Sequence, residues 1–145
     1  MKMLKVGSLV LAAMGLVVVP SVAHAEPIEE CHVDMLVEDD TRTCLQSELK
    51  AAESVMTDFL QEAQSAADRH DKDVLPQNPS RTSARTAVDQ SQSAWAQFRD
   101  AKCQIEAALL FLSPRLDENI MSCKIDLTRA RTIELEELNE RLGGE

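Results

Sequence analysis

The fold of this chain is decided by the stretch Gln92-Ser93-Ala94-Trp95-Ala96-Gln97-Phe98-Arg99-Asp100-Ala101-Lys102-Cys103. It places the only tryptophan of the chain, a phenylalanine, an Arg-Asp pair and a cysteine on consecutive turns of one predicted helix. Because Trp95 and Arg99 are four residues apart, the guanidinium of Arg99 can stack over the indole ring. We therefore predict that Trp95 and Phe98 lie in the core and that Arg99 stabilises them. The alternative is a binding role for Arg99.

The sequence before this stretch predicts an amphipathic helix followed by a break. The helix begins near Thr43, which fits a capping box with Gln46, and it ends near His70. Its apolar stripe comprises Leu45, Leu49, Ala52, Met56, Phe59, Ala63 and Ala66 or Ala67. The break is the segment 75–80, Leu-Pro-Gln-Asn-Pro-Ser, because two prolines and an asparagine cannot continue a helix.

Two further helices are predicted after the break. The second is capped by Ser80 or Thr82, and Ser113-Pro114 ends it. Its inward positions are Ala84, Val88, Ser91, Trp95, Phe98, Lys102, Ile105 and Leu109. The last helix begins near Ser122 and ends at Gly143-Gly144. Its apolar side is Ile125, Leu127, Ala130, Ile133, Leu135, Leu138 and Leu142.

These patterns predict an all-α fold. No stretch shows the sustained apolar–polar alternation of a strand. The predicted architecture is a small antiparallel bundle of about three main helices stapled by two disulfides. Between helices, Asp100 is expected to pair with Arg131 or Arg129. The apolar run Ala107–Leu112 is expected to be buried, and its exposure would indicate an interaction surface.

Residues 1–25 have the features of a cleaved secretory signal peptide. Lys2 and Lys5 lie beside the apolar run 6–19, and Ala23-His24-Ala25 is a cleavage signature. Residues 26–145 are then a single helical domain that is periplasmic or secreted, with an acidic lead-in at residues 26–40. The alternative is an uncleaved anchor, but the apolar run is short for a bilayer span, so we predict no membrane association after cleavage.

The chain is acidic, with a formal net charge of −10 at pH 7. This charge excludes binding to nucleic acid or to an anionic membrane surface by general electrostatics. It favours a cationic partner, and the alternative is that it keeps an exported protein soluble.

The four cysteines, Cys31, Cys44, Cys103 and Cys123, are an even number in a chain predicted to be exported. Two disulfides are therefore expected, with three possible connectivities. A metal site or redox role is the alternative, but no pair has C-x-x-C spacing. We predict no metal and no cofactor.

The sequence carries no pattern of catalytic residues. His32 lies in the acidic lead-in and His70 near a helix end, so neither histidine forms part of a visible nucleophile–base arrangement. There is no glycine-rich loop to hold a phosphate. We predict that the protein is not an enzyme.

The cysteine frame and two motifs resemble a family of exported bacterial proteins, the lysozyme inhibitor LprI-like N-terminal domain. The motifs are Gln92-x-Ala94-Trp95-x-x-Phe98-Arg99-Asp100-x-x-Cys103 and Cys123-x-x-x-Leu127-Thr128-x-x-Arg131-x-x-Glu134-Leu135. The resemblance spans roughly Cys31 to Leu138 and implies a four-cysteine helical domain in which the motif residues are structural. It also implies a lysozyme inhibitor as one function.

Two functions follow as hypotheses. The first is an exported, non-enzymatic inhibitor of a cationic lysozyme, which the acidic chain would attract. The candidate blocking segments are 75–80 and 113–119, in which Arg115 is a candidate partner-binding residue or simply a surface arginine. The second is a periplasmic helical interaction protein of the cell envelope with no lysozyme activity.

Overall fold

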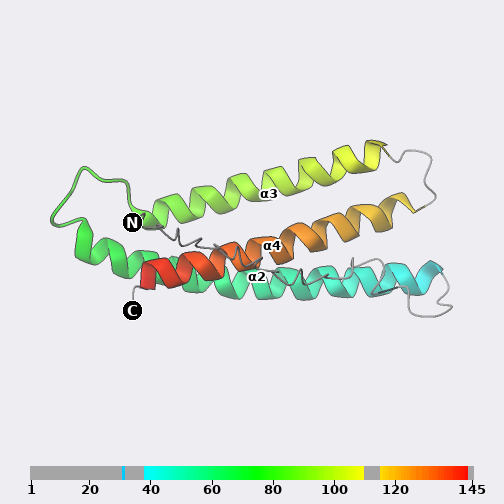
Figure 1. Ribbon diagram of the computed structural model, residues 1–145, viewed down its shortest axis with the longest axis horizontal. Helices are drawn as coiled ribbons and strands as arrows, with labels where there is room; N and C mark the ends of the chain where they lie inside the picture. Colours follow the sequence, from blue (N-terminus) through cyan, green and yellow to red (C-terminus); the bar gives the residue numbers. More distant parts are fainter. Residues whose placement is uncertain (1–30, 32–37, 110–114, 144–145) are drawn as a thin grey trace, which may run out of the picture.

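The computed structural model describes Cys31, residues 38–109 and residues 115–143 of the chain. Within these residues it contains three helices and no strand: α2 (Glu38–Val74), α3 (Ala84–Leu109) and α4 (Leu116–Gly143). Figure 1 shows an elongated bundle in which α3 runs antiparallel to both α2 and α4. The predicted all-α bundle of three main helices is confirmed. The predicted signal peptide and most of the acidic lead-in, His32 included, lie outside the described residues.

Both disulfides predicted from the cysteine count are present. Cys31 is bonded to Cys44 in the second turn of α2, and Cys103 near the end of α3 is bonded to Cys123 in α4. No cysteine is free, because these two disulfides use all four. The first disulfide fixes Cys31 to α2, and the second closes the connection between α3 and α4.

The helix boundaries differ from the predictions at three points. α2 begins at Glu38, so Thr43 lies inside the helix and the predicted capping box there is wrong. An acidic first turn complements the helix dipole, which explains why the helix includes the end of the predicted lead-in. α2 also continues past His70 to Val74. α4 begins at Leu116 rather than near Ser122, again with acidic residues in its first turn.

The N-cap of α3 is Ser83 and not Ser80 or Thr82. The backbone N–H of Thr86 donates to the hydroxyl oxygen of Ser83 at 3.1 Å. This is the bond that an N-cap side chain makes with the third residue of a helix. Ser83, three positions after Ser80 and one after Thr82, therefore sets the start of α3.

The core lies mainly between α2 and α4, which make the most extensive contact, while α3 contacts each of them less. One apolar cluster joins Cys31, Leu45 and Ile125, and a second joins Met56, Ala63 and Leu135. Trp95 of α3 packs at the edge of the second cluster. Small residues, Ala63, Ala66 and Ala67, are fully buried in α2. Their small side chains allow the helices to approach closely, but each of them buries little apolar area.

The buried face of α4 is mostly polar: four of its six buried residues are polar or charged. Its buried residues recur at three- and four-residue steps and are Glu118, Ser122, Ile125, Thr128, Arg131 and Leu135. This stripe of buried residues places α4 against α2 and α3. A search for periodic apolar residues does not find it, because most of its members are polar. This is why its predicted apolar side is only partly correct.

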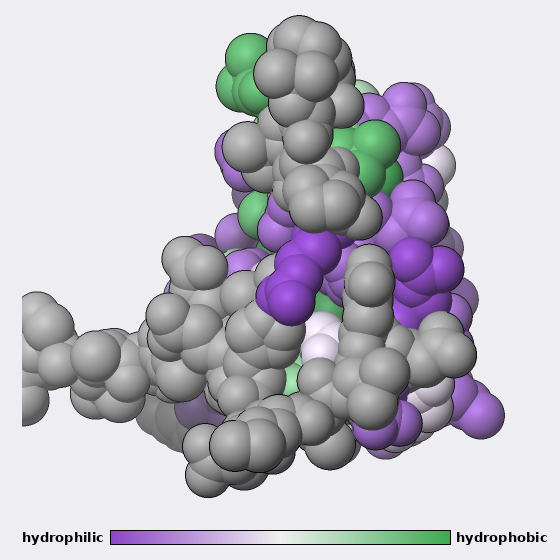
Figure 2. Space-filling view, turned by 90° about the vertical axis from the view of Figure 1, so that its right-hand side faces the viewer, coloured by the Kyte–Doolittle hydropathy of each residue, from purple (hydrophilic) through white to green (hydrophobic). Residues whose placement is uncertain are grey.

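Several residues predicted to face the core are exposed instead. Phe98 is 55% exposed, Ile105 63%, Leu109 78% and Ile133 56%, so the prediction that these side chains are buried is wrong. In the run Ala107–Leu112, Ala107 is buried and Leu109 is exposed, and residues 110–112 lie outside the described residues. Figure 2, in which residues of uncertain placement are grey, shows separate groups of apolar atoms in the upper part of the view.

None of the described helices combines the length and the apolar character that a membrane span requires.

Candidate functional site

The motif residues of α3 and α4 come together around Trp95. The guanidinium carbon of Arg99 lies 5.2 Å from the centroid of the Trp95 ring, and that of Arg131 lies 5.9 Å from it. The predicted stacking of Arg99 on Trp95 is present, and a second arginine, from α4, adds to it. Both distances are within the range of a cation–π interaction. Trp95 is half-buried, with its ring against the apolar cluster of Met56, Ala63 and Leu135.

Arg99 connects all three helices. Its Nη1 donates to Glu53 Oε1 of α2 at 2.9 Å and to Thr128 Oγ1 of α4 at 3.2 Å. The side chain of Arg99 is only 13% exposed, and Thr128 is fully buried. A buried hydroxyl without a partner is costly, so the bond to Thr128 satisfies a group that water cannot reach. Glu53 was not among the predicted site residues, and no sequence signal singles it out.

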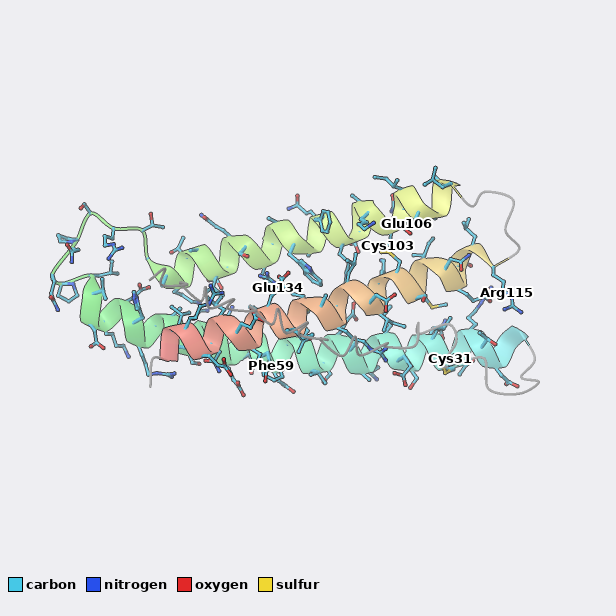
Figure 3. The ribbon with its side chains drawn as sticks, in the orientation of Figure 1. Cys31, Phe59, Cys103, Glu106, Arg115 and Glu134 are labelled. Carbon is cyan, nitrogen blue, oxygen red and sulfur yellow. A yellow bond between two sulfur atoms is a disulfide. The ribbon has the colours of Figure 1, made fainter. Side chains whose placement is uncertain are left out.

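Arg131 makes a matching set of contacts from α4 to α3. It donates from Nε to Gln92 Oε1 at 3.1 Å and from Nη2 to Ser91 Oγ at 2.9 Å. Its Nη1 pairs with Glu134 at 2.9 Å, and Figure 3 shows Glu134 on the side of α4 turned toward α3. The Arg131 side chain is 10% exposed. Most donors of both arginines are thus used within the protein, as expected of a structural cluster.

Asp100 pairs with Lys124, which was not among the predicted site residues. Its carboxylate accepts from Lys124 Nζ at 3.1 Å and from Arg99 Nε at 3.3 Å. The hydrogen bond from Lys124, with the nearby charges, lowers the pKa of Asp100 below its ordinary value. Arg131 is directed to Gln92, Ser91 and Glu134, and Arg129 pairs with Glu48 at 3.1 Å. The prediction that Asp100 pairs with Arg131 or Arg129 named the wrong basic residue.

A second polar cluster lies at the end of the bundle where α2 ends and α3 begins. The carboxylate of Asp71 accepts from the Ser83 hydroxyl at 2.7 Å and from the N–H groups of Ala84 and Arg85 at 2.8 and 3.0 Å. These hydrogen bonds, the one from Ser83 first, lower the pKa of Asp71 from 3.8 to about 2. A carboxylate of α2 therefore caps the N-terminus of α3, which the sequence could not show because the two residues are far apart in the chain.

Arg115 lies just before α4 at the end of the bundle that contains the start of α2 (Figure 3). It is exposed, and its backbone oxygen accepts from the N–H of Asn119 at 3.0 Å. At the same end, Glu118 is fully buried with Arg42 Nη2 3.8 Å from its Oε1. Both oxygens of Glu118 lack a hydrogen-bond partner among the described residues. Arg115 thus stays a surface candidate. It is separate from Trp95, Arg99, Arg131 and their hydrogen-bond partners, which we call the Trp95 cluster.

A shallow groove, open to solvent, runs between α2 and α4. It is lined by Asp58, Gln61, Glu62, Ser65, Arg69 and Asn139. Asn139 Nδ2 donates to Glu62 Oε2 at 3.2 Å, which fixes the register of the two helices there. The groove lies away from the residues of α2 that contact α3, such as Glu53 and Gln64.

Acidic residues concentrate beside this groove. Asp58 and Glu62 are four residues apart on α2, and Glu136 and Glu140 are four residues apart on α4, next to Asn139. All four side chains are exposed. Like charges at this spacing destabilise a helix by a few tenths of a kcal/mol. We call these four residues the acidic face.

No group of three or more histidine, cysteine, aspartate or glutamate side chains within the described residues is arranged to hold a metal ion.

The described bundle corresponds to a known family. The sequence profile described as lysozyme inhibitor LprI matches residues 33–135, which is more than half of the chain. The chain belongs to the lysozyme inhibitor LprI family. The matched region contains both motifs, the Trp95 cluster and three of the four cysteines, with Cys31 lying just before it. The resemblance stated from the motifs is confirmed.

A curated relative of this LprI family chain is found in Rhizobium meliloti (strain 1021) and is an uncharacterized protein. It is 29% identical over 104 residues, which cover 70% of this chain and 73% of the relative. No solved structure matches the chain. The comparisons therefore give the family, and they give no partner or binding residue for this LprI family member.

Proposed function

We propose that this chain is an exported, non-enzymatic inhibitor of a cationic lysozyme, and that the acidic face is where the lysozyme docks. Membership of the lysozyme inhibitor LprI family carries the proposal. The four disulfide-bonded cysteines support a place in the periplasm or outside the cell, since disulfides persist in oxidising compartments. Inhibition by binding needs no catalytic group in the inhibitor.

The charge of the chain gives the proposal its physical basis. A net charge of −10 attracts a cationic enzyme over a distance of about 10 Å at 0.1 M salt and raises the association rate. The acidic face adds a specific place for it, because Asp58 and Glu62 line the groove together with Arg69, and Glu136 and Glu140 flank its lining residue Asn139 in the sequence of α4. Basic side chains of a partner would relieve the repulsion within each like-charged pair.

The first test is lysis of bacterial cell walls by a cationic lysozyme with increasing amounts of the oxidised protein. We expect dose-dependent inhibition that weakens as salt rises from about 20 to 300 mM, because salt screens the attraction. The same assay after reduction of both disulfides tests whether the fold is needed. No inhibition at low salt, where attraction is greatest, would refute the proposal and leave an envelope interaction protein without lysozyme activity.

Two matched variants of α2 test the acidic face. Asp58 lies in the groove and Asp73 outside it, and both are exposed acidic residues of the same helix. Asp58→Lys and Asp73→Lys change the net charge equally. We expect Asp58→Lys to raise the concentration for half-inhibition at least tenfold, which is about 1.4 kcal/mol, and Asp73→Lys to change it by less than about threefold.

A variant of the other candidate surface completes this test. Arg115→Ala is expected to inhibit as well as the parent protein. If Arg115→Ala alone loses inhibition while Asp58→Lys retains it, the lysozyme docks at the Arg115 end of the bundle and the acidic face is excluded.

A further inference from the structure

The outer side of α3 carries an exposed apolar stripe with the spacing of a coiled coil. It consists of Ala94, Phe98, Ala101, Ile105 and Ala108, and all five are exposed. Their separations alternate between four and three residues, which places them in the core positions of a heptad repeat. Leu109, at 78% exposure, adjoins this stripe. We call these five residues the α3 stripe.

The α3 stripe is distinct from the face that holds α3 in the bundle. That face is formed by Val88, Trp95, Arg99, Cys103 and Ala107, which are buried or partly buried or bonded to α2 and α4. The bundle is therefore complete without the α3 stripe. Large apolar side chains grouped on one exposed helix face are uncommon in a monomer and mark an interaction surface.

Charge on α3 argues for a second copy of this chain as the partner. α3 carries three basic residues, Arg85, Arg99 and Lys102, and three acidic residues, Asp89, Asp100 and Glu106. It is the neutral helix of a chain whose net charge is −10. α2 and α4 each have more acidic than basic residues, so two copies repel one another least when their α3 helices meet.

The sizes of the side chains favour an antiparallel pair. The α3 stripe alternates large residues, Phe98 and Ile105, with alanines. In an antiparallel pair of equal helices the first and fourth heptad positions face each other, so each large side chain packs over an alanine of the other copy. In a parallel pair large would face large and alanine would face alanine, leaving gaps.

We propose that the protein forms a symmetric dimer through antiparallel contact of the α3 stripes. From Ala94 to Ala108 the stripe is about 22 Å long on a helix about 10 Å wide, so the two surfaces cover about 450 Å² in total. This area is below that of stable specific interfaces, so the dimer is weak and is populated only toward the upper end of the micromolar range. Salt strengthens it by screening the repulsion between the acidic copies, the opposite of its effect on a complex with a cationic protein.

Sedimentation velocity of the oxidised protein between about 1 and 300 μM tests this. The matched variants are Ile105→Asp in the α3 stripe and Ile133→Asp on α4, whose side chains are similarly exposed at 63% and 56%. We expect Ile105→Asp to raise the dimer dissociation constant at least tenfold, since two charges enter the interface. Ile133→Asp should change it by less than about twofold. Circular dichroism verifies that both variants remain helical.

Three results would overturn the dimer: a monomer at every concentration, a dimer equally affected by both variants, or association that continues beyond two copies. Benzoylphenylalanine placed at Phe98 gives an independent readout, because light should then join two chains into one covalent dimer. No lysozyme is present in these measurements. A negative result here would therefore refute the dimer without affecting the inhibitor proposal, and absence of lysozyme inhibition would not affect the dimer.

Discussion

Replacement of Arg99 by methionine should destabilise the protein by about 2 kcal/mol. Methionine keeps an unbranched apolar stem but removes the guanidinium. The hydrogen bond to the buried Thr128 is worth about 1 kcal/mol, and the stacking on Trp95 about 1 kcal/mol at a site only 13% exposed. The pair with Glu53, whose side chain is 44% exposed, adds only a few tenths of a kcal/mol.

The control is Arg99→Lys, which keeps the charge but lacks the planar fork. A lysine can pair with Glu53 but cannot both stack on Trp95 and reach Thr128, so we expect a loss of about 1 kcal/mol. Urea unfolding followed by circular dichroism at 222 nm, with both disulfides intact, gives the free energies of unfolding. In thermal unfolding the methionine variant should melt about 5–10 °C below the parent protein.

A loss below about 0.5 kcal/mol for Arg99→Met would refute this reasoning. It would mean that the Trp95 cluster does not hold the three helices together and that Arg99 is free to act elsewhere. A loss that is equal in the methionine and lysine variants would show that the fork geometry, and not the charge, carries the whole effect.

Three further predictions concern the core, the α2–α3 turn and the second disulfide. Leu135→Ala removes a fully buried side chain from the cluster with Met56 and should cost about 3 kcal/mol in urea unfolding, well above the small effect of truncating an exposed leucine. Because the pKa of Asp71 falls from 3.8 to about 2 on folding, its contribution to stability is complete above pH 4 and is lost as pH falls toward 2. Asp71→Asn should therefore flatten the acid limb of stability measured from pH 5 to 2, and an unchanged limb would contradict the cap. Replacing Cys103 and Cys123 together by alanine opens a loop of 20 residues, and chain entropy predicts a loss of about 3 kcal/mol. Calorimetry of the double variant checks this value.

The helical fold was predictable because each helix carries its own periodic pattern. The stripe of α2 from Leu45 to Ala67 corresponds to residues that are buried or half-buried in the structure, and the break at 75–80 separates two helices as expected. The cysteine count gave two disulfides. It could not give the pairing, because connectivity depends on which helix ends meet.

The orientation of α3 was not predictable from the same pattern. Phe98, Ile105 and Leu109 follow a helical stripe, but α3 turns Arg99 and Cys103 inward instead. α3 has one apolar face and one face of hydrogen-bonding side chains. Its sequence pattern alone does not determine which of the two faces packs inward, because that depends on the residues of the other helices. The partners here are Glu53 and Thr128, on helices distant in the chain.

Within the Trp95 cluster, the contact between Trp95 and Arg99 was predictable from the sequence, and the hydrogen bonds between different helices were not. Stacking of Arg99 on Trp95 follows from a spacing of four residues. The contact of Arg131 with Gln92 joins residues that are 39 positions apart, and no spacing rule reaches so far. The same limit hid the bond between Asp71 and Ser83 across the turn.

Because of where the two disulfides lie, proteolytic cleavage has different consequences in the two connections between the helices. A cut anywhere between Cys103 and Cys123 leaves α3 and α4 joined through sulfur, so the molecule remains one covalent unit. A cut in the turn between Val74 and Ala84 divides it into two, because the bond from Cys31 to Cys44 stays within the α2 half. Of the two connections between consecutive helices, the turn between α2 and α3 is therefore the one whose cleavage separates the molecule, and the connection between α3 and α4 is not.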